Sequence, residues 1–221
     1  MATSRITHLI TSCTKGKHFQ CGARPVLSIQ AGQTPEEAMA SWAATIKRSQ
    51  SESPVPALSL YSGNHWYTAK EILRTTENLE LWVISAGLGF LNSRELVDAY
   101  EATFHDLPFS HRIWWRELIN TFGKERSANS IETLMKKRPL DAYVIAASPV
   151  YIAAVECDIL AGAKKLINPV AQLTVVTSGA YSGILEPYLI RSESRMMREL
   201  SSNLTCLNIK LAQYIIRSHG N

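Results

Sequence analysis

Several common signatures of function are missing from this chain. It contains neither a G-x-x-x-x-G-K-[ST] phosphate-binding loop nor a G-x-S-x-G nucleophile elbow, which disfavours a P-loop nucleotidase and an α/β-hydrolase. Gly87-Leu88-Gly89 lacks the third glycine of a dinucleotide-binding fingerprint. No uninterrupted apolar segment reaches the length of a membrane span. We therefore expect no cofactor and no membrane partner.

Cysteine pairs of the kind that bind zinc are also missing. The chain has four cysteines and no C-x-x-C pair. Only Cys13 and Cys21 lie near each other, with His18 between them, and this spacing differs from the usual zinc-ligand patterns. Free thiols in a reducing compartment are the preferred interpretation. The apolar run that follows Met1 is too short for the core of a signal peptide, so we expect a cytoplasmic protein that holds no metal.

Length and charge set further limits. The 221 residues and the 46% hydrophobic content fit a single domain, 1–221, with a sizeable core. The formal net charge is +4, from 23 basic and 19 acidic residues. This small excess is compatible with a nucleic-acid partner but does not indicate one by itself. The sequence leaves the oligomeric state open.

Short apolar runs that end in polar loops are the most informative feature that is present. Runs that are apolar on both faces are typical of parallel strands covered by helices. We expect strands at 5–11, 58–60, 80–85, 142–147 and 172–177. In such sheets the ligand crevice lies outside the carboxyl ends of the strands. The predicted fold is a three-layer α/β/α domain with a mainly parallel sheet of four to five strands and right-handed crossovers.

Helix signals alternate with these strands. Thr34-Pro35-Glu36-Glu37 is a strong start, because Thr34 can cap, Pro35 suits the first helical position and Glu37 completes a capping box. Helices are expected at 34–48, 65–75, 109–122, 127–137, 149–166 and 192–217, with one helical turn at 93–99. Residues 105–140 would form a helical insert.

Four motifs together carry a family resemblance. They are Ser12-Cys13-x-Lys15, Leu60-Tyr61-Ser62-Gly63, the stretch 81–91 with Ser85-Ala86 and Leu88-Gly89, and Ala99-Tyr100-Glu101-x-Thr103. In this order they resemble a bacterial family of α/β domains related to the YaaA-type peroxide-stress proteins. More distantly they resemble the core domain of archaeosine synthase, whose fold is like that of uracil-DNA glycosylase. The match covers most of residues 5–105, with Gly87 and Glu101 where the family usually has lysine and aspartate.

The resemblance implies a protein that handles a nucleobase within nucleic acid. One branch associated with it comprises DNA glycosylases that excise modified bases from phage DNA. Breaking an N-glycosidic bond creates an oxocarbenium-like sugar, which a carboxylate stabilises, and the base must first leave the stack. Glu101 is the preferred catalytic carboxylate and Asp98 the alternative, since one helical turn would place both on one face. The competing interpretation is a pair of solvated surface acids.

Other residues of the loops are candidates for contacting the base or substrate. Tyr61 or Tyr100 would stack on a base, unless both pack in the core. Asn64 and His65 would contact a base edge, unless they serve only a turn and a helix start. Backbone N–H groups near Ser12 and Ser178 would hold an anion. The full set of candidates is Ser12, Cys13, Lys15, Tyr61, Ser62, Gly63, Asn64, His65, Ser85, Tyr100, Ser148 and Ser178.

Basic residues would then contact double-stranded DNA. Lys17 and Arg24 follow the first strand, and the insert places basic residues beside Trp114 and Trp115, a mixture that suits phosphate contact and base stacking. The alternative is a solvated helix face with buried tryptophans. The backbone candidates are Lys17, Arg112, Arg116, Lys136 and Lys137, within a group that also includes Lys124, Arg126 and Arg138. A DNA glycosylase in phage defence is the leading hypothesis. A transfer-RNA base-modifying or base-exchanging enzyme and a non-catalytic nucleic-acid binder in stress response are the alternatives.

Overall fold

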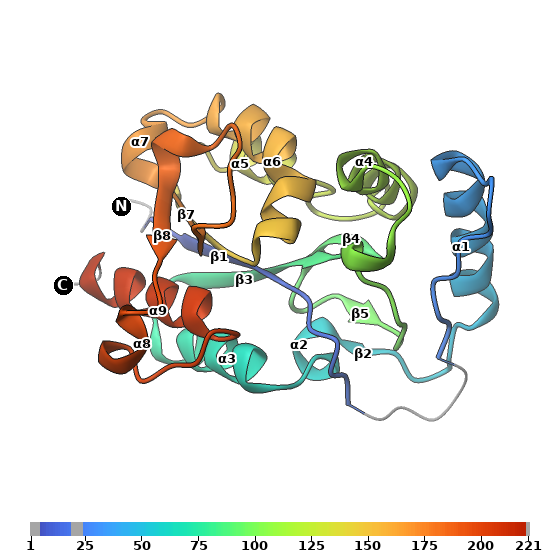
Figure 1. Ribbon diagram of the computed structural model, residues 1–221, viewed down its shortest axis with the longest axis horizontal. Helices are drawn as coiled ribbons and strands as arrows, with labels where there is room; N and C mark the ends of the chain where they lie inside the picture. Colours follow the sequence, from blue (N-terminus) through green and yellow to red (C-terminus); the bar gives the residue numbers. More distant parts are fainter. Residues whose placement is uncertain (1–4, 19–23, 220–221) are drawn as a thin grey trace.

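A central sheet organises the protein, of which a computed structural model describes residues 5–18 and 24–219. Within these residues the sheet has six strands in the order β4-β3-β1-β6-β7-β8 (Figure 1). The strands are β1 (Thr7–Ser12), β3 (Leu79–Ser85), β4 (Gly89–Asn92), β6 (Ala142–Ala146), β7 (Leu173–Ser178) and β8 (Leu189–Ser192). All neighbours pair in parallel except β3 and β4. The predicted α/β class with a mainly parallel sheet is confirmed, with one or two strands more than expected.

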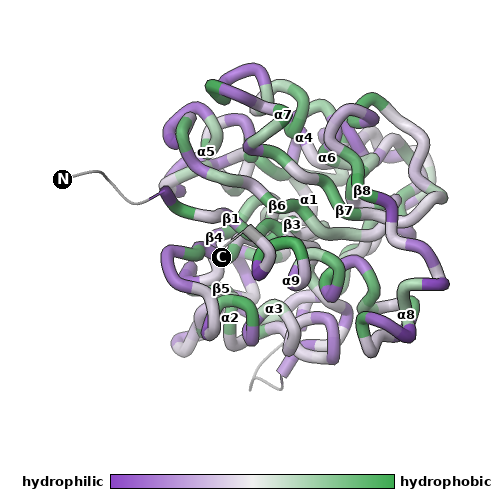
Figure 2. Tube along the Cα trace, turned by 90° about the vertical axis from the view of Figure 1, so that its left-hand side faces the viewer, coloured by the Kyte–Doolittle hydropathy of each residue, from purple (hydrophilic) through white to green (hydrophobic). Residues whose placement is uncertain are grey.

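Helices cover both faces of the sheet. Figure 1 and the turned view of Figure 2 both place α4, α5 and α6 on one side and α3 and α9 on the other, while α1 packs outside α4. The helices are α1 (Pro35–Arg48), α2 (Ala57–Leu60), α3 (Asn64–Thr75), α4 (His111–Phe122), α5 (Ile131–Lys137), α6 (Pro149–Ala163), α7 (Pro169–Gln172), α8 (Met196–Glu199) and α9 (Leu207–His219), with 3₁₀ turns at Phe104–Asp106 and Glu186–Tyr188. The core between the layers is continuous across all six strands.

Helix α1 begins where the capping-box motif of the sequence predicts. The Thr34 hydroxyl accepts a hydrogen bond from the Glu37 N–H at 3.2 Å, and the Glu37 carboxylate accepts one from the Thr34 N–H at 2.9 Å. Pro35 occupies the first turn, where its missing N–H costs nothing. The predicted capping box is therefore confirmed, since both halves of it are formed.

Three predicted elements are wrong. The run at 58–60 belongs to the short helix α2, because a brief apolar run does not distinguish strand from helix. The stretch 93–99 is no helical turn, since β5 (Leu96–Val97) pairs with β2 (Val55–Pro56) there. The helix predicted at 192–217 is interrupted, because its beginning is the end of edge strand β8 and α9 starts only at Leu207. The regular spacing of leucines predicted one buried helix face, but Leu204 is 70% exposed and does not belong to such a face.

The loop between β3 and β4 is held from several sides. Arg126 donates to the carbonyls of Leu88 and Phe90 at 2.6 and 2.9 Å, and its Nε lies 2.9 Å from the Glu95 carboxylate. Gly89 has φ +78° and lies against the backbone of Leu118, where a Cβ would come within 3.3 Å of the carbonyl. Glycine is needed there for both backbone conformation and close approach. Arg126 is thus a structural arginine of the hairpin.

We expect Arg126→Met to lower the free energy of unfolding by about 3 kcal/mol, because it removes the cation beside Glu95 and the donor to two carbonyls. Arg116→Met is the matched control, since Arg116 is 62% exposed and its ion pair is with the neighbouring Glu117, so it should change stability by less than about 0.5 kcal/mol. Urea unfolding followed by circular dichroism measures both. Equal stability of the two variants would contradict this role of Arg126.

Candidate functional site

A ligand site is expected at the point where the chain, having added strands on one side of β1, begins to add them on the other side. From β1 the chain proceeds to β3 on one side and later to β6 on the other, so the switch point lies between β1 and β6. Ligands of open α/β sheets bind outside the carboxyl ends of the strands at such a point. Two cavities lie near this point. Ser12 and Ser148 line one of them, while Cys13 and Lys15, which follow β1, line the other.

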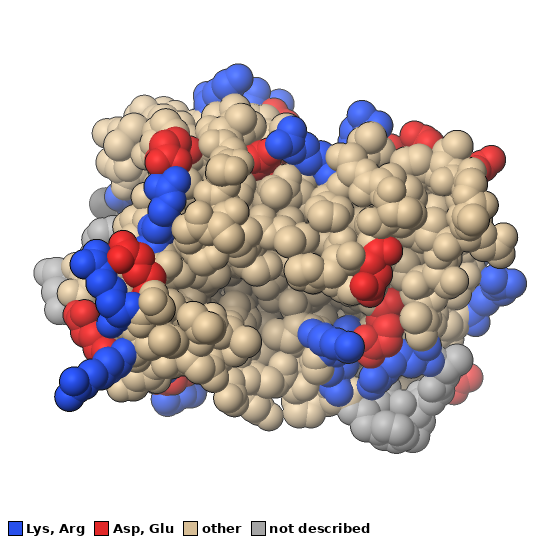
Figure 3. Space-filling model, viewed as in Figure 1, with Lys and Arg blue, Asp and Glu red and all other residues tan. Residues whose placement is uncertain are grey.

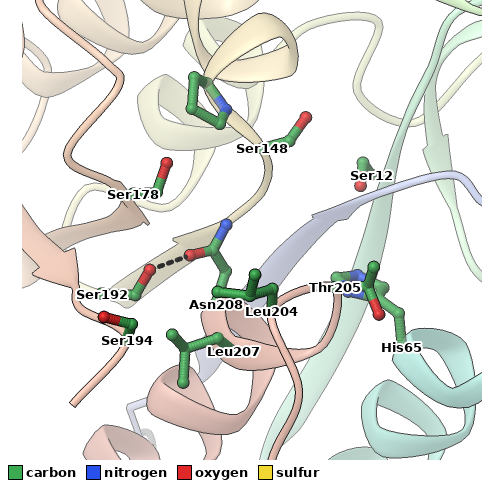
Figure 4. A pocket seen from close by; sticks show the side chains of 11 residues that line it. Ser12, His65, Ser148, Ser178, Ser192, Ser194, Leu204, Thr205, Leu207 and Asn208 are labelled. Atoms are coloured by element: carbon green, nitrogen blue, oxygen red, sulfur yellow. Dashed lines mark hydrogen bonds between the residues drawn. The ribbon is translucent and has the colours of Figure 1, made fainter. Parts of the chain in front are cut away.

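The first, which we call the serine cavity, measures about 410 Å³ (Figure 4). Ser12, Ser148, Ser178 and His65 line it, so four of the predicted substrate residues meet in one place. The rest of the wall comes from Pro149, Ser192, Ser194, Leu204, Thr205, Leu207 and Asn208. The sequence prediction missed Ser192 and Asn208. The strand that ends at Ser192 contains only two apolar residues, too few to predict a strand from the sequence. Asn208 lies inside a helix, so the pattern of strand ends does not point to it.

His65 is a neutral side chain in this cavity. Its Nε2 lies 2.8 Å from the Thr11 hydroxyl, which itself donates to the Ala146 carbonyl at 2.6 Å. Burial lowers the pKa of His65 to about 4, against a smaller opposing effect of a hydrogen bond with the Thr205 backbone. At neutral pH His65 thus brings no charge to the cavity.

The second, which we call the Glu101 cavity, measures about 830 Å³. Val26, Leu27 and Ile29 give it an apolar wall. Its polar lining includes Cys13, Lys15, Glu101, Thr103, His105, Asp106 and Tyr151. Two backbone hydrogen bonds of 2.8 Å each hold Glu101 in place. The Glu101 N–H donates to the Pro25 carbonyl, and the Leu27 N–H donates to the Glu101 carbonyl. A carboxylate therefore stands at a defined place opposite apolar surface.

Two cations surround the carboxylate of Glu101. Arg24 contacts one oxygen at 2.9 Å and Lys17 lies 3.8 Å from the other. The Lys17 side chain is only 1% exposed and its ammonium lies 4.8 Å from the centre of the Tyr100 ring. Burial lowers the pKa of Lys17, while the charge of Glu101 opposes this effect. Lys17, expected to contact DNA phosphates, instead points inward and balances Glu101.

Asp98 lies apart from Glu101. It accepts hydrogen bonds from the Ser51 N–H, at 3.3 Å, and from the Ser51 hydroxyl, and it lines neither cavity. The expectation that one helical turn brings Asp98 and Glu101 to a common face is wrong, because Leu96 and Val97 are paired in β5. Glu101 alone of the two carboxylates borders a cavity.

The two predicted stacking tyrosines are buried in the core. Tyr61 and Tyr100 are 0% exposed, and their hydroxyl oxygens lie 2.7 Å apart. The Tyr100 hydroxyl is also 2.5 Å from Ser85 Oγ, which accepts from the N–H groups of Gly87 and Leu88. Burial raises the pKa of both tyrosines, so both stay neutral. These residues, including Ser85, hold the site together and do not face a ligand.

The remaining loop candidates lie at the edge of this network. The Ser62 carbonyl accepts from the Thr14 hydroxyl at 2.9 Å, Gly63 has φ +95°, and Asn64 begins α3 as an exposed residue. None of these three lines either the serine cavity or the Glu101 cavity. Cys13 does, and its sulfur lies 3.4 Å from the Tyr151 hydroxyl.

The basic residues of the predicted insert are divided between structural and exposed roles. Arg112 pairs with the buried Glu156, and Lys137 donates to the Ser127 carbonyl at 2.5 Å. Trp114 and Trp115 are 0% and 3% exposed, so they pack in the core rather than interleaving with the cations. Arg112 and Lys137 are nevertheless exposed, as are Arg116, Lys124, Lys136 and Arg138. On the face drawn in Figure 3 positive and negative side chains lie next to each other around a hollowed, uncharged middle.

The described residues show neither a cluster of metal ligands nor a membrane-spanning helix. In residues 5–18 and 24–219 no three His, Cys, Asp or Glu side chains gather as metal ligands, and Cys21 lies outside the described residues. None of the described helices combines the length and the apolar character needed to cross a bilayer. No protein-family model, curated protein or solved structure matches the chain. The family resemblance therefore stays a hypothesis that the motifs alone carry.

The neutral His65 predicts a pH dependence of stability. Its folded pKa of about 4 lies below the reference value of 6.5, so between these values the unfolded chain binds a proton that the folded chain does not. The free energy of unfolding should fall as the pH drops through this window, by about 3 kcal/mol in total. Urea unfolding at pH 7 to 4.5 should show a shallower slope for His65→Gln than for the unchanged protein. Identical slopes would contradict the buried neutral state.

The tyrosine network gives a second prediction. Tyr100→Phe removes the hydroxyl between Tyr61 and Ser85 and should destabilise the fold by about 2 kcal/mol, because buried polar groups lose a partner. Tyr214→Phe alters a side chain that is 56% exposed and should leave the melting temperature almost unchanged. Differential scanning calorimetry compares the two, and a Tyr100→Phe variant as stable as the control would show that the hydroxyl chain is dispensable.

Proposed function

We propose that this protein is a DNA glycosylase, which hydrolyses the N-glycosidic bond of a modified nucleobase. The observation that carries the proposal is Glu101, a carboxylate on the wall of a cavity of about 830 Å³ that is otherwise partly apolar. The order of motifs that resembles nucleobase-handling domains with a fold like that of uracil-DNA glycosylase supports the same conclusion.

The chemistry requires a carboxylate that stays ionised. When the base departs, positive charge develops on the sugar, and a carboxylate facing it stabilises this charge or activates water. Arg24 and Lys17 lie within 4 Å of the Glu101 carboxylate, at 2.9 and 3.8 Å, and hold it in place on the cavity wall. His105 lines the same cavity and would donate a proton to the departing base.

The shape of the cavity suits a nucleoside. Its volume lies within the range of small-molecule sites, and Val26, Leu27 and Ile29 offer an apolar surface to the face of a base. A base within a duplex reaches such a cavity only after it leaves the stack. Lys15, on the cavity wall, together with the exposed Arg116, would contact the phosphate backbone. Lys136 is in the last turn of α5, just before β6, and so lies at the amino ends of the strands, away from this cavity. Lys17, Arg112 and Arg126 have other partners.

We expect Glu101→Gln to reduce release of free base from phage DNA with modified bases by about 100-fold or more, because the amide cannot stabilise the sugar cation. Asp98→Asn is the matched control and should retain activity, since Asp98 contacts Ser51 away from the cavity. Chromatography of the released bases measures both, with unmodified DNA and bulk transfer RNA as parallel substrates.

Each result of this assay has a clear meaning. Base release from modified DNA that depends on Glu101 supports the proposal. Altered nucleosides in transfer RNA alone would instead support a base-modifying or base-exchanging enzyme. Undiminished turnover by Glu101→Gln, or binding without any product, would refute the proposed mechanism.

A further inference from the structure

The serine cavity has no part in the reaction proposed for Glu101. Its polar wall arises from one regularity of the sheet. Ser12, Ser178 and Ser192 are the last residues of β1, β7 and β8, and Ser148 follows β6 by two residues. The carboxyl ends of four adjacent parallel strands therefore bring four hydroxyl groups to one edge.

Three of these hydroxyls have no hydrogen-bond partner among residues 5–18 and 24–219. Ser192 donates to the Asn208 amide oxygen at 2.7 Å, and the Asn208 amide nitrogen donates to the Ala147 carbonyl at 2.9 Å. By contrast, the hydroxyls of Ser12, Ser148 and Ser178 make no hydrogen bond within the described part of the chain. Figure 4 shows Ser148 between Ser178 and Ser12 around the same space. Because a serine hydroxyl rotates between staggered positions, each of the three is free to turn toward a ligand.

The charges of the lining restrict what this ligand is. No Asp, Glu, Lys or Arg of the described residues lines the cavity, and His65 is neutral. A cation would find no opposite charge there, and a wholly apolar ligand would leave the free hydroxyls unsatisfied. An anion finds hydroxyl donors and no repelling carboxylate. The chemistry of the lining therefore favours an anion.

Helix α6 adds donors to the same place. Ser148 is its N-cap and Pro149 its first residue, and the Ser148 side chain makes no capping bond. The N–H groups of Val150 and Tyr151, in the first turn, consequently have no partner inside the helix. Since this helix has 15 residues, its positive end also favours negative charge. These groups complement the three hydroxyls, which come from separate strand ends.

From this combination we propose that the serine cavity binds a phosphate group, free or as the phosphate of a small ester. Its volume of about 410 Å³ lies at the lower end of the range for small-ligand sites. The apolar Leu204 and Leu207 on the opposite wall would face the carbon part of an ester. The inference does not rest on hydrolysis at Glu101, because the two cavities share no lining residue.

The test is an NMR titration of the ¹⁵N-labelled full chain with inorganic phosphate and with ribose 5-phosphate. We expect both probes to shift the amide signals of Ser12, Ser148 and Val150. Tighter binding of ribose 5-phosphate assigns the site to esters, and equal binding assigns it to the free anion. No shift at these residues, or shifts only at scattered surface lysines, would overturn the proposal.

Variants make the test specific. Ser178→Asp places a negative charge in the cavity and should weaken phosphate binding about tenfold or more, whereas the neutral Ser178→Asn should stay within about threefold. Ser12→Asp repeats the test from another strand should the first variant fold poorly. Phosphate binding equal to that of the unchanged protein in a folded aspartate variant would refute the site. Glu101→Gln should bind phosphate normally, so this result is independent of the catalytic proposal.

Discussion

The hydroxyl group of Tyr100 is the contact on which the geometry of the site depends. It lies between Tyr61, at the end of α2, and Ser85, at the end of β3, and so joins three segments that are distant in the sequence. Its ring also leaves no room for a side chain at Gly87, where a Cβ would come within 2.6 Å. Lys17 lies over the same ring. Because Glu101 is the next residue, the position of its carboxylate follows from the anchoring of Tyr100.

Part of this arrangement is readable from the sequence. Apolar runs identify four of the parallel strands, and serines at their ends locate the crevice, because both signals are local and repeat along the chain. The capping box of α1 is equally local. The strand predicted at 58–60 and the long helix predicted at 192–217 are wrong because their signals are not decided locally. Whether such residues form strand, helix or loop depends on what they pack against, and Leu204 packs against very little.

The site itself was only half predictable. Polar residues that follow strands were expected in one pocket, yet the structure divides them between two. Ser12 and Cys13 line different cavities because neighbouring side chains of an extended chain point to opposite faces. The sequence did not predict which charged side chains are buried and which are exposed. Lys17 and Lys15 look alike in the sequence, but one is buried beside Glu101 and the other is exposed.

The adjacency of Ser12 and Cys13 has a consequence for how the protein can change. The Cys13 N–H still donates to the Ile84 carbonyl at 2.9 Å, so the peptide that links the two residues remains attached to the sheet. This peptide joins Ser12, which lines the serine cavity, to Cys13, which lines the Glu101 cavity. A substitution that shifts this peptide changes the walls of both the serine cavity and the Glu101 cavity. Substitutions near one cavity are therefore limited by what the other cavity must keep.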